Sequence, residues 1–231
     1  MTGEIPLPIP AATVVLVRDR GDHLETLMLR RSANIAFGGM WVFPGGRVEP
    51  DDGEGESGAR RAAAREAAEE AGLVVDSELL VPFAHWTPPP VAPKRFATWF
   101  FVAPAPTGVV SVDGGEIHDH LWVTPNEAFE RHAAGEIELA PPTWVTLHWL
   151  ADCPNVEAAM QRARSETVEY FSTHIAKGEG GELVAVWQGD VAYEGGDLAA
   201  AGGRHRLAMT ERGWRYERFT AEAPPGRNPT Y

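Results

Sequence analysis

The chain has 231 residues, 44% of them apolar and 23% charged, a composition that suits one large folded domain or one domain with an extension. Its net charge of −13 argues against a general nucleic-acid binder or a protein that binds anionic membranes, although a small polyanion could bind beside a local cation. Cys153 is the single cysteine, which excludes a disulfide framework and a thiolate zinc cluster, and we interpret it as a small packed side chain.

The N-terminal stretch and the apolar runs bear on location. The stretch MTGEIPLPIP lacks the basic start and the long apolar run of a signal peptide. The apolar stretches elsewhere have the length of strands and are too short to span a bilayer. We therefore expect a cytoplasmic protein without a membrane segment.

Strand and helix signals alternate along most of the chain. Two β-rich runs flank the turn signal RDRGDH and predict a hairpin, and a third short strand ends at Pro44 and two glycines. An acidic, glycine-rich loop over 50–58 leads into an alanine-rich helix, for which Ser57 is the expected N-cap and Gly72 the expected stop. In chain order, the predicted strands cover 11–17, 24–31, 40–46, 79–86, 96–104 and 117–125. Further helices are predicted over 125–135, 141–152 and 155–171.

The character of the sequence changes after Lys177. Glycine-punctuated runs there alternate polar and apolar residues, which predicts a small β-meander, and we expect the tail over 223–231 to be loose. The interleaved strands and helices before it favour an α/β sandwich with a mixed β-sheet, followed by this C-terminal β-rich extension. We place the two domains at 8–176 and 177–231.

The octet REAAEEAG, residues 65–72, crowds three glutamates on one face of the alanine-rich helix. At about 100° per residue, Glu66, Glu69 and Glu70 lie within an arc of roughly 100°. Each like-charge pair at this spacing costs about 0.2–0.5 kcal/mol, so a compensating interaction is expected. A hard divalent cation would provide it, because Mg²⁺ prefers carboxylate, carbonyl and water oxygens and shares them with substrate phosphates. The alternative is a solvated helix with an Arg65–Glu69 ion pair.

A longer pattern surrounds the octet. The sequence FPGG at 43–46, an acidic loop and REAAEEAGL at 65–73 together resemble the Nudix box, the loop–helix–loop of the Nudix hydrolases. Eight positions match it in type and order, namely Gly46, Arg65, Glu66, Ala67, Glu69, Glu70, Gly72 and Leu73. The resemblance implies a Nudix-type α/β/α sandwich and the hydrolysis of pyrophosphates in which a nucleoside diphosphate is joined to another group.

The chain departs from the box in one respect. From Gly46 to Arg65 it is five residues longer than the pattern expects, and the extra length lies in the stretch EPDDGEGESG. The role of the first acidic residue of the box therefore stays open among Asp52, Glu54 and Glu56.

The resemblance implies roles for individual residues of this sequence. Glu66 and Glu70 would be the main ligands of a Mg²⁺ or Mn²⁺ ion, and Glu69 would add a further ligand or a contact to the catalytic water. The Gly45 carbonyl would complete the inner shell, and Arg65 would orient the glutamates by salt bridge rather than touch substrate. Such an ion neutralises phosphate charge and lowers the pKa of a bound water, which assists an otherwise poor nucleophile.

A general base outside the box is expected on a loop across the site. We assign it to Glu116 in DGGEIHDHLW, which lies at a loop-to-strand junction, with Asp113 and His118 as rivals. The string HDH at 118–120 suggests transition-metal ligands, but third and fourth ligands are lacking, so it is interpreted as an ordinary strand with polar alternation.

The stretches that flank the box narrow the substrate. LMLRRSANIAFGGMWVFPGGRVEPDD, HWTPPPVAPKRFATWFFVA and GEIELAPPTWVTLHWL resemble the branch of the family that contains peroxisomal coenzyme A diphosphatases, across roughly residues 10 to 152. This resemblance implies coenzyme A or an acyl derivative as the substrate, with 3′,5′-ADP and 4′-phosphopantetheine or its acyl form as products. The ending PTY does not match the peroxisomal targeting pattern.

The extra 3′-phosphate of such a ligand would need cations. Two arginines precede the glycine-rich turn, and a lysine and an arginine lie in the proline loop. The planar guanidinium of an arginine suits a phosphate. The alternative is that these four side chains are solvent-exposed loop charges. The predicted phosphate contacts are Arg30, Arg31, Lys94 and Arg95. Trp86 and Trp99 are predicted either to stack on adenine or to belong to the core.

Three other functions stay open. The same machinery could act on another dinucleotide such as NADH or ADP-ribose, or the fold could bind a ligand without turnover, although the intact glutamates argue against that. An isomerase would need a catalytic cysteine, and Cys153 lies far from any plausible position. We expect a small-molecule partner, no nucleic acid and no membrane. The segment after Lys177, with Trp187 and Trp214, is predicted to mediate homodimer formation or to cover the substrate.

Overall fold

The computed structural model describes residues 7–32, 38–92, 94–112, 114–211 and 213–220. They form two compact units: the larger contains Pro8–Trp86 and Phe96–Tyr170, and the smaller contains Leu7, Thr87–Arg95 and the chain from Phe171 onward. The tail over 223–231, which was expected to be loose, and the rival base Asp113 lie outside the described residues.

A mixed sheet forms the centre of the larger unit. Its strands are β1 (Ile9–Arg20), β2 (His23–Arg31), β3 (Trp41–Val42), β4 (Gly45–Arg47), β5 (Val81–Thr87), β6 (Phe96–Pro104), β7 (Ile117–Val123) and β8 (Glu169–Ser172). Their order is β3-β2-β1-β6-β5-β8, with β4 beside β1 and β7 beside β2. β1 and β6 are parallel, whereas β2 and β4 run antiparallel to β1. The predicted mixed sheet is confirmed.

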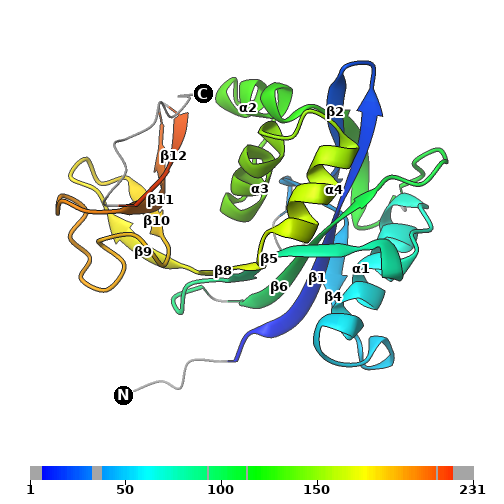
Figure 1. Cartoon of the computed structure of the whole chain (residues 1–231), viewed down its shortest axis with the longest axis horizontal. Coiled ribbons are helices and arrows are strands. Elements are labelled where there is room, and N and C mark those ends of the chain that lie inside the picture. Colours follow the sequence, from blue (N-terminus) through cyan, green and yellow to red (C-terminus); the bar gives the residue numbers. More distant parts are fainter. Residues whose placement is uncertain (1–6, 33–37, 93, 113, 212, 221–231) are drawn as a thin grey trace. The chain divides into compact units, whose positions relative to one another are not determined.

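Helices cover both faces of this sheet. They are α1 (Gly55–Ala71), α2 (Pro125–Ala133), α3 (Pro141–Ala151) and α4 (Val156–Ser165), with 3₁₀ turns η1 (Pro50–Asp52) and η2 (Ser77–Leu79). α1 lies on one side of the sheet, and α3 and α4 lie on the other (Figure 1). Because β1 is covered on both faces, its Val14–Val17 run is buried throughout instead of alternating.

The hairpin predicted around RDRGDH is confirmed. Arg20 pairs with His23, so Gly21 and Asp22 form a two-residue loop between β1 and β2. Gly21 has a φ of 60°, a left-handed conformation that glycine adopts without steric cost and that tight hairpin turns require.

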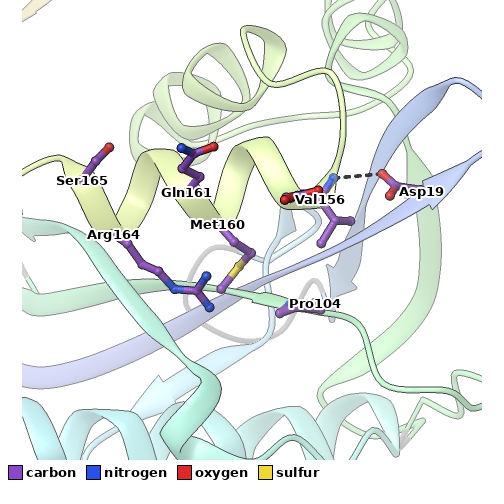
Figure 2. A pocket seen from close by; sticks show the side chains of 8 residues that line it. Asp19, Pro104, Val156, Met160, Gln161, Arg164 and Ser165 are labelled. Carbon is purple, nitrogen blue, oxygen red and sulfur yellow. Dashed lines mark hydrogen bonds between the residues drawn. The ribbon is translucent and has the colours of Figure 1, made fainter.

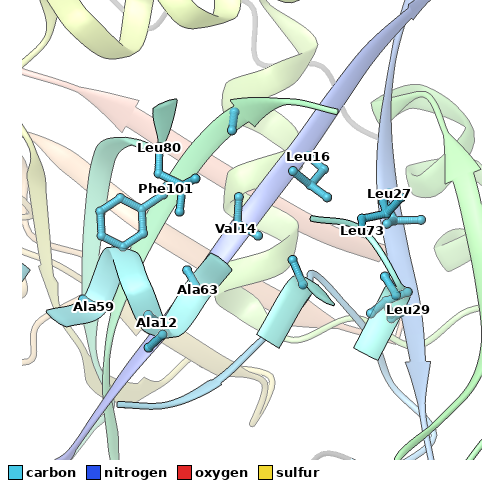
Figure 3. Close-up of a cluster of buried hydrophobic side chains, with 14 of the residues drawn as sticks. Ala12, Val14, Leu16, Leu27, Leu29, Ala59, Ala63, Leu73, Leu80 and Phe101 are labelled. Atoms are coloured by element: carbon cyan, nitrogen blue, oxygen red, sulfur yellow. The ribbon is translucent and has the colours of Figure 1, made fainter. Parts of the chain in front are cut away.

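The alanine-rich face of α1 packs on the sheet. Its buried members are Ala59, Ala62, Ala63, Ala67 and Ala71, and they contact a cluster that includes Val14, Leu16, Leu27, Leu29 and Phe101 (Figure 3). Alanine has no side chain beyond Cβ, so the helix can approach the strands closely. Full burial of each leucine or valine in such a cluster contributes about 1.5–3 kcal/mol. This packing fixes which face of α1 points toward β4, and thereby where the glutamates lie.

The sequence prediction is confirmed for the C-terminal end of α1 and is wrong for its N-terminal end. Gly72 has a φ of 68° and donates its N–H to the Ala68 carbonyl, as expected of a glycine that ends a helix. The prediction of Ser57 as N-cap is wrong, because the helix begins at Gly55 after Glu54 in extended conformation. η1 takes up part of the acidic loop, and the helix starts three residues earlier than expected.

Two other predicted elements are divided in the structure. The strand expected over 40–46 breaks at Phe43 and Pro44 into β3 and β4, which pair with β2 and β1 respectively. Proline has no N–H to donate to a sheet, so a break at this position is favoured. The helix expected over 155–171 ends at Ser165, and Glu169–Ser172 is β8 instead. Glu166 already has extended dihedral angles, and the bulky residues that follow prefer strands.

The smaller unit contains a second sheet. β9 (His174–Lys177), β10 (Leu183–Val186), β11 (Arg204–Thr210) and β12 (Gly213–Phe219) pair antiparallel in sequence order. The predicted C-terminal β-meander is confirmed. A domain boundary between residues 176 and 177, which would fall within β9, stays a prediction. In the part of the chain that the structure describes, every helix is too short or too polar to cross a membrane.

Candidate active site

α1 presents Glu66 and Glu70, one helical turn apart, to the diglycine of β4. The Gly45 N–H donates a hydrogen bond to Glu70 Oε2 at 2.9 Å. A Cβ atom on Gly46 would overlap the Glu66 carboxylate, and one on Gly45 would lie 2.5 Å from the Ala12 carbonyl oxygen. Gly45 is therefore required by the close approach of β1, and Gly46 by the carboxylate that fills the space beside it.

Arg65 connects these glutamates to the loop before α1. Its guanidinium forms ion pairs with Glu66 at 2.9 Å, Glu69 at 3.0 Å and Asp52 at 2.9 Å, and donates to the Arg47 carbonyl at 3.0 Å. The hydrogen bond with Asp52 and, less strongly, that with Glu66 raise the pKa of Arg65, which stays fully charged. Four contacts on one planar group hold its position, so Arg65 can orient the Glu66 carboxylate.

Asp52 is the acidic loop residue that joins this network. It is buried, and its carboxylate accepts the Glu49 N–H at 2.9 Å, which closes the η1 turn. Burial alone would raise the pKa of Asp52, but the hydrogen bonds from Arg65 and Glu49 outweigh it and lower the pKa below its ordinary value. Of its two rivals, Glu56 forms an ion pair within α1 and Glu54 is the N-cap residue.

A second arginine, Arg31 at the end of β2, bridges two carboxylates from different elements. Its guanidinium lies 3.8 Å from Glu70 Oε1 and 3.2 Å from Glu116 Oε2. The Ser32 N–H also donates to the Glu116 carbonyl at 2.7 Å, which fixes the backbone before β7. The structure therefore brings Glu116, the predicted base, next to the glutamates of α1.

The electrostatic environment of these carboxylates is unusual. Burial raises the pKa of Glu70 to about 7, in spite of the Gly45 N–H and Arg31, with Glu66 and Glu116 adding to the increase. Burial also raises the pKa of Glu66, which Arg65 offsets in part. Burial thus disfavours the charged form of both carboxylates, and a nearby cation would favour it again.

These residues suit a hard divalent cation by their chemistry, since the donors are all carboxylate oxygens. Nudix hydrolases generally use such metals. Within the described ranges, however, no three carboxylate, imidazole or thiolate side chains already surround one point as metal ligands. Glu66 and Glu70 would hold an ion, and Arg31 would have to give way for Glu116 to join them.

Other predicted site residues lie in different surroundings. Glu69 is 58% exposed and forms an ion pair with Arg65, and its role toward metal or water stays a prediction. Arg30 is exposed on β2 and pairs in register with Asp119. Lys94 and Arg95 belong to the smaller unit, where Arg95 donates to the Pro88 carbonyl. His118 and its neighbours in the HDH string are exposed on β7.

The two tryptophans proposed to stack on adenine differ in exposure. Trp86 is buried and packs against Phe100, which places it in the core. Trp99 is half-buried on β6, and its ring lies 4.9 Å from that of His85, which in turn lies 5.4 Å from that of Tyr170. We call these three residues the aromatic row.

The aromatic row lies on the same face of the sheet as α1. Gly46 pairs in register with Ala12, Ala12 with Trp99, and Trp99 with His85. Residues that pair in register point to the same side of a sheet, and on Gly46 that side faces Glu66. At about 4.8 Å per strand, His85 lies roughly 14 Å across the sheet from Gly46.

A hollow of about 720 Å³ lies elsewhere in the larger unit, beside α4 (Figure 2). It is lined by Asp19, Pro104, Val156, Glu157, Met160, Gln161, Arg164 and Ser165. The Asp19 carboxylate accepts the Val156 N–H at 2.9 Å and so caps α4. None of the residues predicted for the diphosphate site lines this hollow.

Cys153 has the packed position expected of it. It is buried at the end of α3, and its sulfur contacts the Trp149 carbonyl at 3.8 Å. Burial raises the pKa of the Cys153 thiol, which disfavours the reactive thiolate.

Comparisons with known proteins agree with this fold. The NUDIX domain family model matches residues 7–150, and no curated protein matches the chain. A NUDIX hydrolase from Alicyclobacillus acidocaldarius is 25% identical, with a TM-score of 0.62 over 68% of this chain and 97% of that one. The NUDIX domain of Shewanella oneidensis NrtR, complexed with ADP ribose, is 16% identical, with a TM-score of 0.50 over 68% of this chain and 89% of that one. A MutT/nudix family protein from Enterococcus faecalis is 18% identical, with a TM-score of 0.51 over 72% and 71%.

The mixed sheet lies between helices and forms an α/β/α sandwich, in which an acidic helix faces a strand with two glycines. The chain belongs to the NUDIX domain family, whose model matches well over half of its length. It is a Nudix hydrolase, an enzyme of pyrophosphate cleavage. The predicted Nudix-type sandwich with an additional C-terminal sheet is therefore confirmed.

Sequence reasoning missed two features of the site. It predicted Arg31 as a phosphate contact, which stays a prediction, and did not find that Arg31 bridges Glu70 and Glu116. It also did not choose between Asp52 and its two rivals, although Asp52 alone of the three is separated from Gly46 by five residues, the spacing that the box expects. Counting forward from Gly46 was the signal that favoured it.

Proposed function

We propose that this Nudix hydrolase cleaves the diphosphate of coenzyme A or an acyl-coenzyme A, with Mg²⁺ or Mn²⁺ as cofactor. The products would be 3′,5′-ADP and 4′-phosphopantetheine or its acyl form. Glu70 and Glu116 come from distant parts of the chain and meet at the Arg31 guanidinium, and this observation carries the proposal of metal-assisted hydrolysis. The choice of coenzyme A rests on the flanking stretches of sequence described above.

Each side chain has a part in the proposed reaction. Glu66 and Glu70 hold the ion, helped by the Gly45 carbonyl, and Arg65 keeps the Glu66 carboxylate in place. Glu69 contacts the ion or its water from the exposed side of α1. A bound Mg²⁺ supplies charge neutralisation at the phosphates and a more acidic water.

The general base of the proposed reaction is Glu116. Its Oε2, which pairs with Arg31 at 3.2 Å, would accept the proton of the attacking water once Arg31 has moved away from it. Substrate phosphates would be met by arginines and lysine, which offer directional hydrogen bonds as well as charge. The proposed phosphate contacts are Arg30, Arg31, Lys94 and Arg95.

The aromatic row is proposed to receive the planar ring of the substrate. Its position on the face of α1 and its partial exposure support stacking on a base, which contributes about 1–3 kcal/mol in nucleic-acid binding proteins. A nucleotide conjugate is long enough to extend from Gly46 toward His85.

A substrate panel tests the proposal. Coenzyme A, acetyl-coenzyme A, ADP-ribose, NADH and nucleoside triphosphates would each be incubated with Mg²⁺ or Mn²⁺, and the products identified by mass. We expect 3′,5′-ADP from the two coenzyme A substrates, at a higher kcat/KM than from the others. Faster cleavage of ADP-ribose, the ligand in the NrtR complex, would replace the substrate assignment but keep the chemistry. Turnover of none would favour a binding module.

Three further points stay proposals. The protein is placed in the cytoplasm, it forms a homodimer, and the chain after Lys177 takes part in dimer contacts or covers the substrate. A truncation at Lys177, compared with the full chain by light scattering and by kinetics, tests the last two. Unchanged mass and unchanged kinetics would contradict them.

A further inference from the structure

Arg31 lies beside Glu70 and Glu116, where a metal ion held by these carboxylates would also lie. Its side chain is only 18% exposed, and its two terminal nitrogens face Glu70 on α1 and Glu116 before β7. Glu116 is 63% exposed, and this contact connects its carboxylate to the guanidinium that faces α1. Charge-assisted pairing of this kind is stronger where one partner is buried, as Glu70 is.

The backbone aims this side chain at the site. The pairing of β2 with β7 shifts register between Arg30 and Arg31, so that Arg30 lies opposite Asp119 and Arg31 opposite Ile117. Such a bulge leaves one residue unpaired and redirects the side chains beside it. The Arg31 N–H and carbonyl are themselves bonded to Met40 and Gly39. The guanidinium therefore starts from a fixed backbone and is not a loose surface charge.

The oxygens of Glu70 are divided between two partners. Oε2 accepts the Gly45 N–H at 2.9 Å, which leaves Oε1 as the atom free to meet a cation. Arg31 is the cation that lies nearest to it, at 3.8 Å. A divalent ion bound to Oε1 would meet the positive guanidinium at close range, so the two cations cannot both occupy this place without repulsion.

We propose that Arg31 is the internal counter-ion of the metal site: it neutralises Glu70 and Glu116 while no divalent ion is bound and releases them when one binds. The inference rests on the proposed function, in that Glu70 is taken as a metal ligand. It makes Arg31 a positioning residue that sets metal affinity, in addition to any contact with phosphate.

Metal binding without substrate tests this role. The full-length protein, Arg31→Met and Arg31→Lys would be titrated with Mn²⁺, and free Mn²⁺ measured by electron paramagnetic resonance. Methionine keeps an unbranched apolar stem but removes the charged guanidinium, so Arg31→Met should bind Mn²⁺ at least about fivefold more tightly, the lower end of typical coupling between two sites. Lysine keeps the positive charge but lacks the planar guanidinium that spans both carboxylates. The Mn²⁺ affinity of Arg31→Lys should therefore lie between those of the wild type and Arg31→Met.

A second readout is the thermal midpoint with and without Mn²⁺. Without metal, Arg31→Met should melt below the wild type, because Glu70 and Glu116 lose their counter-ion; with saturating Mn²⁺ the gap should narrow. Arg164→Met, an exposed arginine on α4, is the control for the change in net charge and should leave Mn²⁺ affinity unchanged.

The two hypotheses fail differently. A wild-type protein that binds no Mn²⁺ would overturn the metal site and the counter-ion together. A wild type that binds Mn²⁺, with Arg31→Met within twofold of it or weaker, would overturn the counter-ion alone, whatever happens to turnover. If Arg31→Met does not fold, Arg31→Gln, which also removes the positive charge, is judged by the same criterion.

Discussion

The fold constrains both oxygens of the Glu70 carboxylate. It is buried, one oxygen is hydrogen-bonded to Gly45, and the other faces Arg31. Glu70→Gln keeps the shape and the hydrogen bond but removes the negative charge. We expect kcat to fall at least about 100-fold while the protein folds normally, because a metal ligand is lost and not a core contact. Steady-state kinetics and circular dichroism would measure both, with the exposed Glu157→Gln on α4 as the control. Kinetics close to those of the wild type would contradict the metal assignment.

The raised pKa of Glu70 also predicts how the metal-free protein responds to pH. With a pKa of about 7, against 4.5 ordinarily, the folded state binds the proton more tightly than the unfolded state. This group therefore stabilises the protein fully below about pH 4.5, and the contribution is lost as pH rises through about 7. At about 1.4 kcal/mol per pKa unit, the loss is roughly 3 kcal/mol.

Urea denaturation in a chelator at several pH values between 4.5 and 8 would measure this effect. The wild type should lose stability relative to Glu70→Gln as pH rises, because glutamine cannot ionise and the other titrating groups are common to both proteins. Two parallel stability curves would show that Glu70 titrates near its ordinary pKa.

At this scale the sequence predicted part of the site and missed the rest for a physical reason. The helical period places Glu66 and Glu70 on one face, so they could be found from spacing alone. The contact of Arg31 with Glu116 joins residues far apart in the chain and depends on a register shift between β2 and β7. No local pattern encodes that shift.

Among the elements, β4 allows an effect on activity to be separated from an effect on stability, because its two glycines face different neighbours. A Cβ atom on Gly46 would meet the flexible end of Glu66, which can move aside; one on Gly45 would meet backbone atoms of β1, which cannot. Gly46→Ala should therefore reduce kcat at least about tenfold through displacement of a ligand, with the melting temperature changed little. Gly45→Ala should cost about 1–3 kcal/mol of stability through overpacking.

The paired variants serve as each other's control. Differential scanning calorimetry and kinetics on both would separate the two effects, since about 1 kcal/mol corresponds to a melting shift of about 2–4 °C in a chain of this size. Equal loss of stability in both variants would mean that Glu66 is held too rigidly to yield.

Tyr170 tests whether the aromatic row binds the ring of the substrate. It is 59% exposed and lies beside His85, so Tyr170→Ala should fold normally. Loss of a stacking partner worth about 1–3 kcal/mol should raise KM about fivefold or more, with kcat nearly unchanged. The exposed Val74→Ala is the control. An unchanged KM on the best substrate would remove the aromatic row from the binding site.

The accuracy of the predicted elements depended on what ends each of them. Gly72 could be predicted because a left-handed glycine ends a helix by local geometry. The end of α4 at Ser165 could not, since the helical pattern continues for six more residues and it is the pairing of β8 in the sheet that decides. Strand formation there is a tertiary effect that overrides local propensity.

The two units of the molecule differ in how far sequence could describe them. The larger unit carries the family pattern, so its fold and its acidic helix were predictable together. The family match ends at residue 150. Beyond Lys177 the alternation of polar and apolar residues predicted the β-meander but not which side chains lie in its interior. That interior contains a buried ion pair between Asp190 and Arg206, which composition gives no reason to expect.

Asp190 therefore provides a test of what holds the smaller unit together. Its carboxylate accepts two hydrogen bonds from Arg206, at 2.6 and 2.7 Å, and the N–H groups of Ala192 and His205. Burial would raise the pKa of Asp190, but these four donors outweigh it and lower the pKa. The pair's contribution is thus present above about pH 4 and is lost as pH falls through the lowered pKa.

Asp190→Asn would leave the buried Arg206 without its counter-charge, a change that typically costs about 3–5 kcal/mol. We expect the loss to be local, so amides of β10 and β11 should exchange with deuterium much faster while those of β1 and α1 change little. Asp197→Asn, an exposed aspartate of the same unit that bonds the Ala199 N–H, is the matched control. Equal exchange in the two variants would mean that packing around Trp187, and not the ion pair, stabilises the second sheet. Faster exchange spread evenly over both sheets would instead show that the units unfold as one.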